Sequence, residues 1–170
     1  SSSAVYGPSS NLLSEESLVN PNTNYGLSKL NAERLLKEYS ESNFVLIILR
    51  IFNLFGPYQS CEFLIPQIIE SIKKKKYLTI NNPGAIRDFI YIDDCLKILE
   101  KLIEKINTNV TLNLGSGTGT DVETVVLIIK KILRKYTNSQ IKINSRYQES
   151  CNSYVADISK LKKYHFTYGL

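Results

Sequence analysis

Residues 44–49, Phe-Val-Leu-Ile-Ile-Leu, are apolar without interruption. A strand with one face in water alternates apolar and polar side chains, whereas a continuous apolar run of this length is typical of a strand covered on both faces. Parallel sheets flanked by helices provide that environment. The run therefore predicts a parallel sheet within an α/β fold.

The rest of the chain agrees with this fold class, because strand-like and helix-like segments alternate along it. The expected elements are the end of a buried strand at residues 1–6, a polar loop at 9–22, a helix at 24–40, the strand at 44–49, a helix at 63–75 with Pro66 in its first turn, extended pieces at 77–80 and 86–92, a helix to residue 103 capped by Asp93 or Asp94, a strand at 110–114, a glycine-rich loop at 115–119, a helix to residue 136 capped by Asp121, a short strand at 141–143 and a helical turn or two at 157–164.

Composition narrows the class of protein. With 170 residues, 43% hydrophobic and 22% charged, the chain can bury one core. Three dispersed cysteines and one histidine encode neither a disulfide framework nor a metal site, and we expect a reduced, cytoplasmic setting. Much of the net charge of +5 comes from lysines at residues 73–76, which complement a helix end, so no nucleic-acid partner is expected.

The ends of the chain and its apolar runs bear on the wider protein. No run approaches the roughly 20 apolar residues of a membrane span, and no secretory leader begins the chain. The chain starts without methionine and without a preceding apolar strand. We therefore expect it to be the later part of a longer protein.

Tyr25 and Lys29 are the first candidates for chemistry. They are four residues apart near the start of the expected helix at 24–40, so both side chains lie on one face. A cation beside a phenol favours the phenolate, which is the form that a general base needs to take a proton from an alcohol. The spacing also arises by chance in a chain with 11 tyrosines, so its weight depends on the surrounding motifs.

Five motifs in order carry a resemblance to a known family. They are Ser-Ser-Ser-Ala-Val-Tyr-Gly at residues 1–7, Tyr-Gly-Leu-Ser-Lys at 25–29, Leu-Arg-Ile-Phe-Asn-Leu-Phe-Gly-Pro at 49–57, Arg-Asp-Phe-Ile-Tyr-Ile-Asp-Asp at 87–94 and Asn-Leu-Gly-Ser-Gly at 113–117. Together they resemble the nucleotide-sugar epimerase/dehydratase family, the extended short-chain dehydrogenase/reductases. The resemblance implies the later half of a Rossmann-like doubly wound parallel sheet at residues 1–60, and a small α/β subdomain at 61–170 that binds the nucleotide sugar, with some segments returning to the sheet. The cofactor-binding glycine turn of the family is absent here.

The resemblance also implies roles for individual residues. Tyr25 becomes the acid/base, Lys29 holds the nicotinamide ribose, and Ser2 is the hydroxyl that bonds the reacting sugar oxygen, with Ser3 as the fallback in the substrate site. Phe52 lies near the nicotinamide. The remaining substrate-binding residues it implies are Asn53 and Arg87 at the diphosphate, Asn113, and Arg146 at a phosphate.

Plainer alternatives exist for three of these residues. Asn53 could cap a turn, and Arg87 could pair with Asp88 or Asp94. Asn113 could satisfy backbone groups of the loop instead of touching a ligand.

The resemblance narrows the reaction without settling it. Dehydratases of the family carry acidic residues just after the catalytic hydroxyl, where this chain has Ser3 and Ala4, so dehydration is disfavoured. Epimerisation through a keto sugar and reduction of a 4-keto sugar both remain, with NAD or NADP as cofactor, a nucleoside-diphosphate sugar as substrate, a homodimer as the full-length form, and surface polysaccharide as the destination. A non-catalytic nucleotide-sugar-binding or scaffold protein is the alternative from another class.

Overall fold

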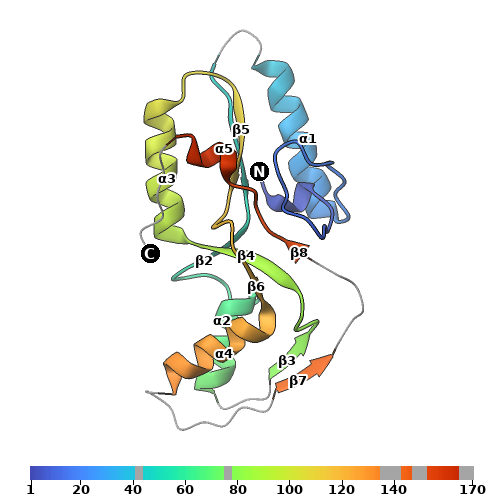
Figure 1. Ribbon diagram of the computed structural model, residues 1–170, viewed down its shortest axis with the longest axis vertical. Coiled ribbons are helices and arrows are strands. Elements are labelled where there is room, and N and C mark those ends of the chain that lie inside the picture. The colour runs from blue at the N-terminus through green and yellow to red at the C-terminus, as the bar shows by residue number, and fades with distance from the viewer. Residues whose placement is uncertain (41–43, 75–77, 135–142, 147–152, 165–170) are drawn as a thin grey trace.

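The computed structural model describes residues 1–40, 44–74, 78–134, 143–146 and 153–164 (Figure 1). Its helices are η1 (Ser3–Val5, a 3-10 turn), α1 (Asn24–Tyr39), α2 (Leu64–Lys73), α3 (Ile92–Lys105), α4 (Val122–Leu133) and α5 (Ser159–Lys162). Its strands are β1 (Ile47–Ile51), β2 (Asn53–Phe55), β3 (Leu78–Asn81), β4 (Ile86–Tyr91), β5 (Val110–Leu114), β6 (Gly119–Asp121), β7 (Ile143–Arg146) and β8 (Ser153–Tyr154). The predicted α/β class is confirmed.

The apolar run opens the parallel pairing that it predicts. β1 pairs in parallel with β5, with Leu49 opposite Leu112, and α1 and α3 lie on opposite sides of this pair (Figure 1). Ser2 extends the arrangement, since it forms an isolated parallel bridge with Ile51. The segment before α1 is therefore attached to the edge of β1.

The other strands lie beyond the ends of β1 and β5. β4 is central to them: it pairs in parallel with β2 and β8 and antiparallel with β6, and β3 pairs in parallel with β7. The sequence patterns do not predict β2, β6 or β8, because each has only two or three residues and shows no periodicity.

Two apolar cores support these layers. The larger core lies around β1 and β5 and includes Leu30, Leu102 and Leu112, while the smaller core packs α2 against α4 through Ile68 and Val126. α2 and α4 lie side by side at one end of the molecule, away from α1 and α3 (Figure 1). The cleft between the two regions is where site residues can meet.

Local signals mark several helix ends. Thr23 caps α1 by accepting a hydrogen bond from the Gly26 N–H at 3.0 Å, and Asp121 caps α4 as predicted. The prediction for α3 is wrong in detail: Tyr91 holds the N-cap position, and Asp93 and Asp94 lie in the first turn. There the two carboxylates complement the helix dipole without capping.

Candidate functional site

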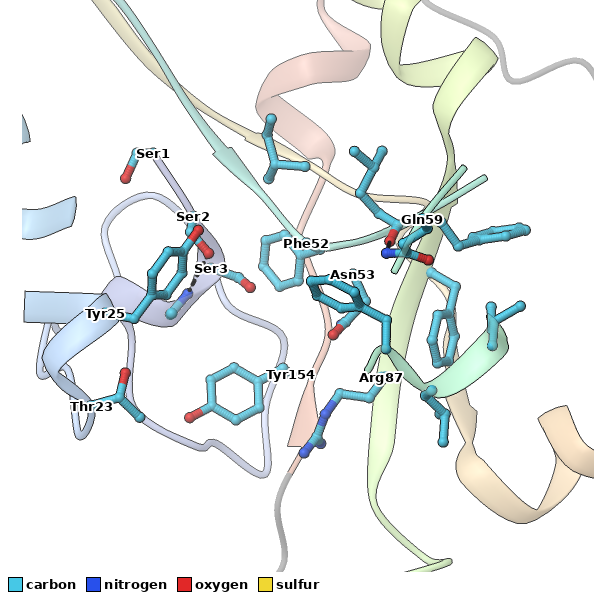
Figure 2. A pocket seen from close by; sticks show the side chains of 18 of the residues that line it. Ser1, Ser2, Ser3, Thr23, Tyr25, Phe52, Asn53, Gln59, Arg87 and Tyr154 are labelled. Carbon is cyan, nitrogen blue, oxygen red and sulfur yellow. Dashed lines mark hydrogen bonds between the residues drawn. The ribbon is translucent and has the colours of Figure 1, made fainter. Parts of the chain in front are cut away.

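A cavity of about 750 Å³ lies between the N-terminal segment with the start of α1 on one side and β2, β4 and β8 on the other (Figure 2). The predicted site residues that line it are Ser2, Ser3, Tyr25, Phe52, Asn53 and Arg87. They come from segments as much as 85 positions apart in the sequence, and the fold brings them to one cavity.

One wall of the cavity carries hydroxyl groups. Ser2 caps η1, its Oγ accepting a hydrogen bond from the Ala4 N–H at 3.2 Å, and Ser3 follows it into the cavity wall. Tyr25 joins them from the first turn of α1, with 57% of its surface exposed. α1 approaches η1 this closely because residue 26 is glycine: a Cβ there would lie 2.1 Å from the Ala4 carbonyl oxygen.

Lys29 lies beside Tyr25 but outside the cavity lining. Its Nζ is 5.4 Å from the centroid of the Tyr25 ring, which is a cation–π distance. The helical spacing therefore places the ammonium and the phenol together, with the ammonium on the side of the ring away from the substrate cavity.

The opposite wall combines an apolar floor with a cation. Phe52 is 4% exposed and packs against Tyr6, with ring centroids 6.4 Å apart. Asn53 donates a hydrogen bond from Nδ2 to the Asp88 carbonyl at 3.2 Å, so this amide is braced against β4. The Arg87 guanidinium lies 5.2 Å from the Tyr154 ring, and Nη1 donates to the Ile86 carbonyl at 2.9 Å. Burial lowers the pKa of Arg87, and the Tyr154 side chain opposes that shift.

Asp88 supports this wall from behind. Its carboxylate accepts hydrogen bonds from the backbone N–H groups of Ser116, Gly117 and Ala156 and from the Ser116 hydroxyl, at 2.6 to 3.1 Å. Burial raises the pKa of Asp88, and these donors act in the opposite direction. Asp88 thereby ties the glycine-rich loop and the residues after β8 to the strand that carries Arg87.

The structure places two predicted residues elsewhere. Asn113 is fully buried: its Oδ1 accepts from the Tyr6 hydroxyl and its Nδ2 donates to the Leu13 carbonyl, so its prediction as a substrate-binding residue is corrected in favour of the structural alternative. Arg146 belongs to β7, opposite Asn81, but its side chain lies outside the described part of the chain.

Tyr154 is a cavity residue that the sequence reasoning missed. It comes from a two-residue strand, lies between the Tyr25 side and Arg87, and hydrogen-bonds with the Asn22 side chain (Figure 2). No local pattern distinguishes it among the tyrosines of the chain. Only its pairing beside Arg87 on β4 brings it to the site.

Two further findings concern other kinds of site. Within the described ranges, no group of three or more His, Cys, Asp or Glu side chains is arranged to hold a metal ion. Among those same residues, no helix is both long and apolar enough to cross a membrane.

Residues 1–115 match the family model described as "NAD dependent epimerase/dehydratase family". Among curated proteins, the chain is 36% identical over 107 residues to an uncharacterized UDP-glucose epimerase of Bacillus subtilis, a match that covers 62% of this chain and 34% of that protein. The matched stretch is thus about a third of that relative's length.

Solved structures match over nearly the whole chain. A UDP-glucuronic acid 4-epimerase from Bacillus cereus, in complex with UDP-glucuronic acid and NAD, superposes with a TM-score of 0.85 at 27% identity, covering 100% of this chain and 55% of that one. A UDP-N-acetylglucosamine 4-epimerase from Methanobrevibacter ruminantium, in complex with UDP-N-acetylmuramic acid, gives a TM-score of 0.86 at 30% identity, covering 98% and 55%.

Proposed function

Because the chain belongs to the NAD dependent epimerase/dehydratase family, we propose that it carries the substrate side of an NAD-dependent epimerase acting on a nucleoside-diphosphate sugar. The observation that carries the proposal is the cavity itself, which has Ser2 and Tyr25 on one wall and Arg87 on the other. A sugar between hydroxyl groups and a cation matches a sugar whose other end bears a diphosphate. The UDP-sugars bound by the two similar solved structures support this class of ligand.

The proton chemistry belongs to the hydroxyl wall. In this proposal Tyr25 takes the proton from a sugar hydroxyl as the carbon beneath it is oxidised, and returns it when the carbon is reduced. Ser2 donates a hydrogen bond to the same sugar oxygen. Lys29, beside the Tyr25 ring, favours the ionised form of a phenol and contributes a donor on the side away from the substrate.

The residues around Tyr25 fit a nicotinamide cofactor. A phenol and an ammonium on the exposed side of α1 are suitable partners for ribose hydroxyls, and Phe52 provides an apolar surface at the same end of the cavity. The chemistry that NAD supplies when bound is reversible uptake of a hydride from a sugar carbon. NAD is our choice over NADP because the B. cereus structure holds NAD.

The anion end of the cavity anchors the substrate. Arg87 presents a planar guanidinium held against the Tyr154 ring, and Asn53 lies one strand away on β2. A guanidinium can donate two parallel hydrogen bonds to phosphate oxygens, so it fixes orientation as well as supplying charge. We propose that Arg87 and Asn53 bind the diphosphate.

Two features favour epimerisation over the other reactions of the family. The cavity of about 750 Å³ leaves room for a keto sugar to present its second face, and Ser3 and Ala4 supply no acidic group for dehydration. Reduction of a 4-keto sugar uses the same residues and is the second candidate.

The wider organisation stays a proposal as well. It comprises a substrate subdomain at residues 61–170 beside a sheet region at 1–60, a place for the chain in the later part of a longer enzyme, and a homodimer. The exposed apolar side chains of α1, among them Leu35 and Leu36, support further packing on that helix.

The test is turnover of a panel of UDP-, dTDP- and GDP-sugars by the full-length protein with NAD, followed by separation of the epimers. Tyr25→Phe should lower kcat by about 10²-fold or more, as expected for a lost general base. Tyr39→Phe, on the same helix but outside the cavity, should leave kcat unchanged. A Tyr25→Phe enzyme with wild-type turnover would refute the assignment. Activity only on 4-keto sugars with reduced cofactor would favour the reductase, and nucleotide-sugar binding without turnover would favour the non-catalytic alternative.

A further inference from the structure

Glu33 on α1 and Arg50 on β1 form a buried ion pair beneath the site. The Arg50 Nη2 and Glu33 Oε2 atoms are 2.8 Å apart, Arg50 Nε donates to Glu33 Oε1 at 3.0 Å, and the two side chains are 4% and 3% exposed. Burying two charges costs free energy that close geometry only partly recovers, so such a pair is weak support for stability by itself. Its use must be sought in what it holds in place.

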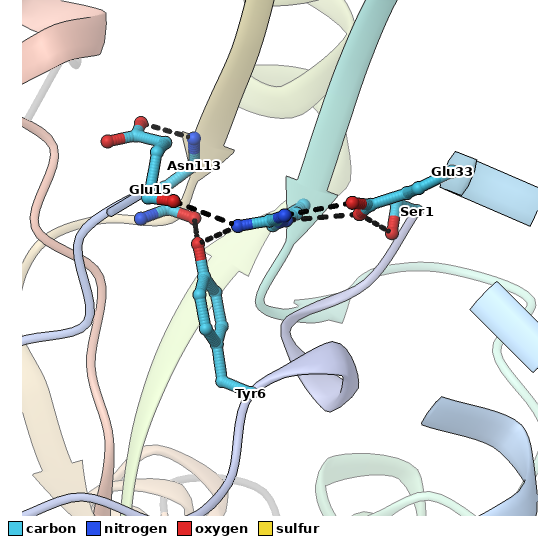
Figure 3. Close-up of polar contacts among 6 residues, drawn as sticks. Ser1, Tyr6, Glu15, Glu33 and Asn113 are labelled. Atoms are coloured by element: carbon cyan, nitrogen blue, oxygen red, sulfur yellow. Dashed lines mark hydrogen bonds and ion pairs between the residues drawn. The ribbon is translucent and has the colours of Figure 1, made fainter. Parts of the chain in front are cut away.

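The pair holds both ends of one short segment. The Ser1 hydroxyl donates to Glu33 Oε1 at 2.5 Å, and Arg50 Nη1 donates to the Tyr6 hydroxyl at 2.8 Å (Figure 3). Between these anchors lie Ser2 and Ser3, which line the cavity. The segment that carries the proposed catalytic hydroxyl is therefore tied to a single ion pair at each end.

The Tyr6 anchor is itself braced. Its hydroxyl donates to Asn113 Oδ1 at 2.8 Å, and the Asn113 N–H donates to the Glu15 carboxylate at 2.7 Å (Figure 3). Arg50 also lies over the Tyr6 ring, 4.9 Å from its centroid. Within the described part of the chain, no buried side-chain nitrogen or oxygen of a non-exposed residue lacks a hydrogen-bond partner. A fully satisfied network of this kind has one low-energy arrangement.

The same pair also fixes the helix that carries Tyr25. Glu33 lies eight residues after Tyr25 on α1, so a displacement of Glu33 moves a rigid helix and Tyr25 with it. We propose that the Glu33–Arg50 pair is a positioning unit that sets the separation between Ser2 and Tyr25. This inference rests on the proposed function, because it assigns the pair to the reacting end of that site.

Positioning and simple anchoring predict different kinetics. An anchor that serves only stability lowers the folded fraction and leaves the rate of the folded enzyme unchanged. A positioning unit changes the rate of the folded enzyme while substrate and cofactor affinities persist, since Arg87 and Asn53 lie on the other wall. It also acts through Tyr25, so its effect must depend on the Tyr25 hydroxyl.

The decisive variant is Glu33→Gln, which keeps the size of the side chain and removes its charge. We expect kcat of the full-length, folded enzyme to fall about 10- to 100-fold, as for a misplacement of about 1 Å. KM for the nucleotide sugar and Kd for NAD should stay within about twofold. Introduced into Tyr25→Phe, the same change should alter the residual rate less than about twofold. Glu38→Gln, on the exposed surface of α1, is the matched control and should behave as wild type.

Tyr6→Phe is the second variant, because it leaves both charges paired and removes only the hydroxyl that Arg50 and Asn113 share. It should lower kcat in the same direction, with KM unchanged, even if Glu33→Gln does not fold. Variants that lower the melting temperature yet keep wild-type kcat would overturn the positioning role while leaving the proposed function intact. An equal loss in the wild-type and Tyr25→Phe backgrounds would do the same. Absence of turnover in wild type would overturn the proposed function, and this inference with it.

Discussion

Gly26 is the position where one methyl group tests the geometry of the site most directly. It lies in the first turn of α1, next to Tyr25, and an added Cβ would be 2.1 Å from the Ala4 carbonyl oxygen and 2.9 Å from the Pro21 side chain. Both the oxygen and the helix belong to backbone. Restoring an ordinary contact of about 3.4 Å therefore requires η1 and α1 to separate by about 1.3 Å.

Gly26→Ala brings two opposing effects on stability. Replacing glycine in a helix stabilises the folded state by about 0.5–1 kcal/mol, whereas overpacking against backbone costs about 1–3 kcal/mol. The contact is severe, so we expect a net loss of about 1–2 kcal/mol in the free energy of unfolding. The separation of η1 and α1 also moves Ser2 from Tyr25, and kcat should fall by about 10-fold or more.

Urea unfolding and steady-state kinetics of the full-length protein measure the two effects. Gly84→Ala is the matched control, because a Cβ at that position meets nothing within 4 Å. It should change the free energy of unfolding by less than about 0.5 kcal/mol and leave kcat unchanged. If Gly26→Ala were as stable and as active as Gly84→Ala, the close contact between α1 and η1 would not exist in solution, and the reasoning would be refuted.

Arg87→Ala should weaken nucleotide-sugar binding by about 2 kcal/mol, roughly 30-fold in Kd, and leave NAD binding unchanged in calorimetry; equal losses of both affinities would make Arg87 a structural residue. The pH dependence of stability tests the buried pair: burial opposes ionisation of Glu33, but hydrogen bonds from Arg50 and Ser1 outweigh it, so the pKa of Glu33 lies below its ordinary 4.5. A lowered carboxyl pKa contributes stability that is complete above pH 4.5 and is lost as the pH falls through the folded-state value. The difference in urea midpoint between wild type and Glu33→Gln should therefore shrink on acidification below pH 4.5, and a difference that is independent of pH would contradict this.

Much of the fold follows from short-range patterns in the sequence. The bounds of α1 and the cap at Thr23 follow from helical periodicity and a hydroxyl residue before it, and β5 follows from five residues with apolar side chains at its buried positions. The fold class follows as well, because the continuous apolar strand requires cover on both faces. Each of these signals acts over a few residues, so one sequence contains it.

Charged residues in apolar surroundings are a signal that the sequence analysis did not use. Arg50 directly follows the apolar run at residues 44–49, and Glu33 lies on the buried face of α1 with Leu30. A charge at a buried position requires a partner, so each of the two predicts an unidentified ion of opposite sign. Which ion it is depends on how α1 packs against β1, and periodicity carries no information on that contact.

The sequence by itself determined the α/β class, the helix that presents Tyr25 and Lys29 together, and the motifs that place the chain in its family. Only the tertiary structure decided that Asn113 is buried beneath the site, that Tyr154 lies against Arg87, and that one ion pair holds both ends of residues 1–6. The physical reason is range: hydrogen-bonded turns and amphipathic faces are set by neighbours three or four positions apart, whereas the cavity is built from contacts between strands and loops distant in the chain.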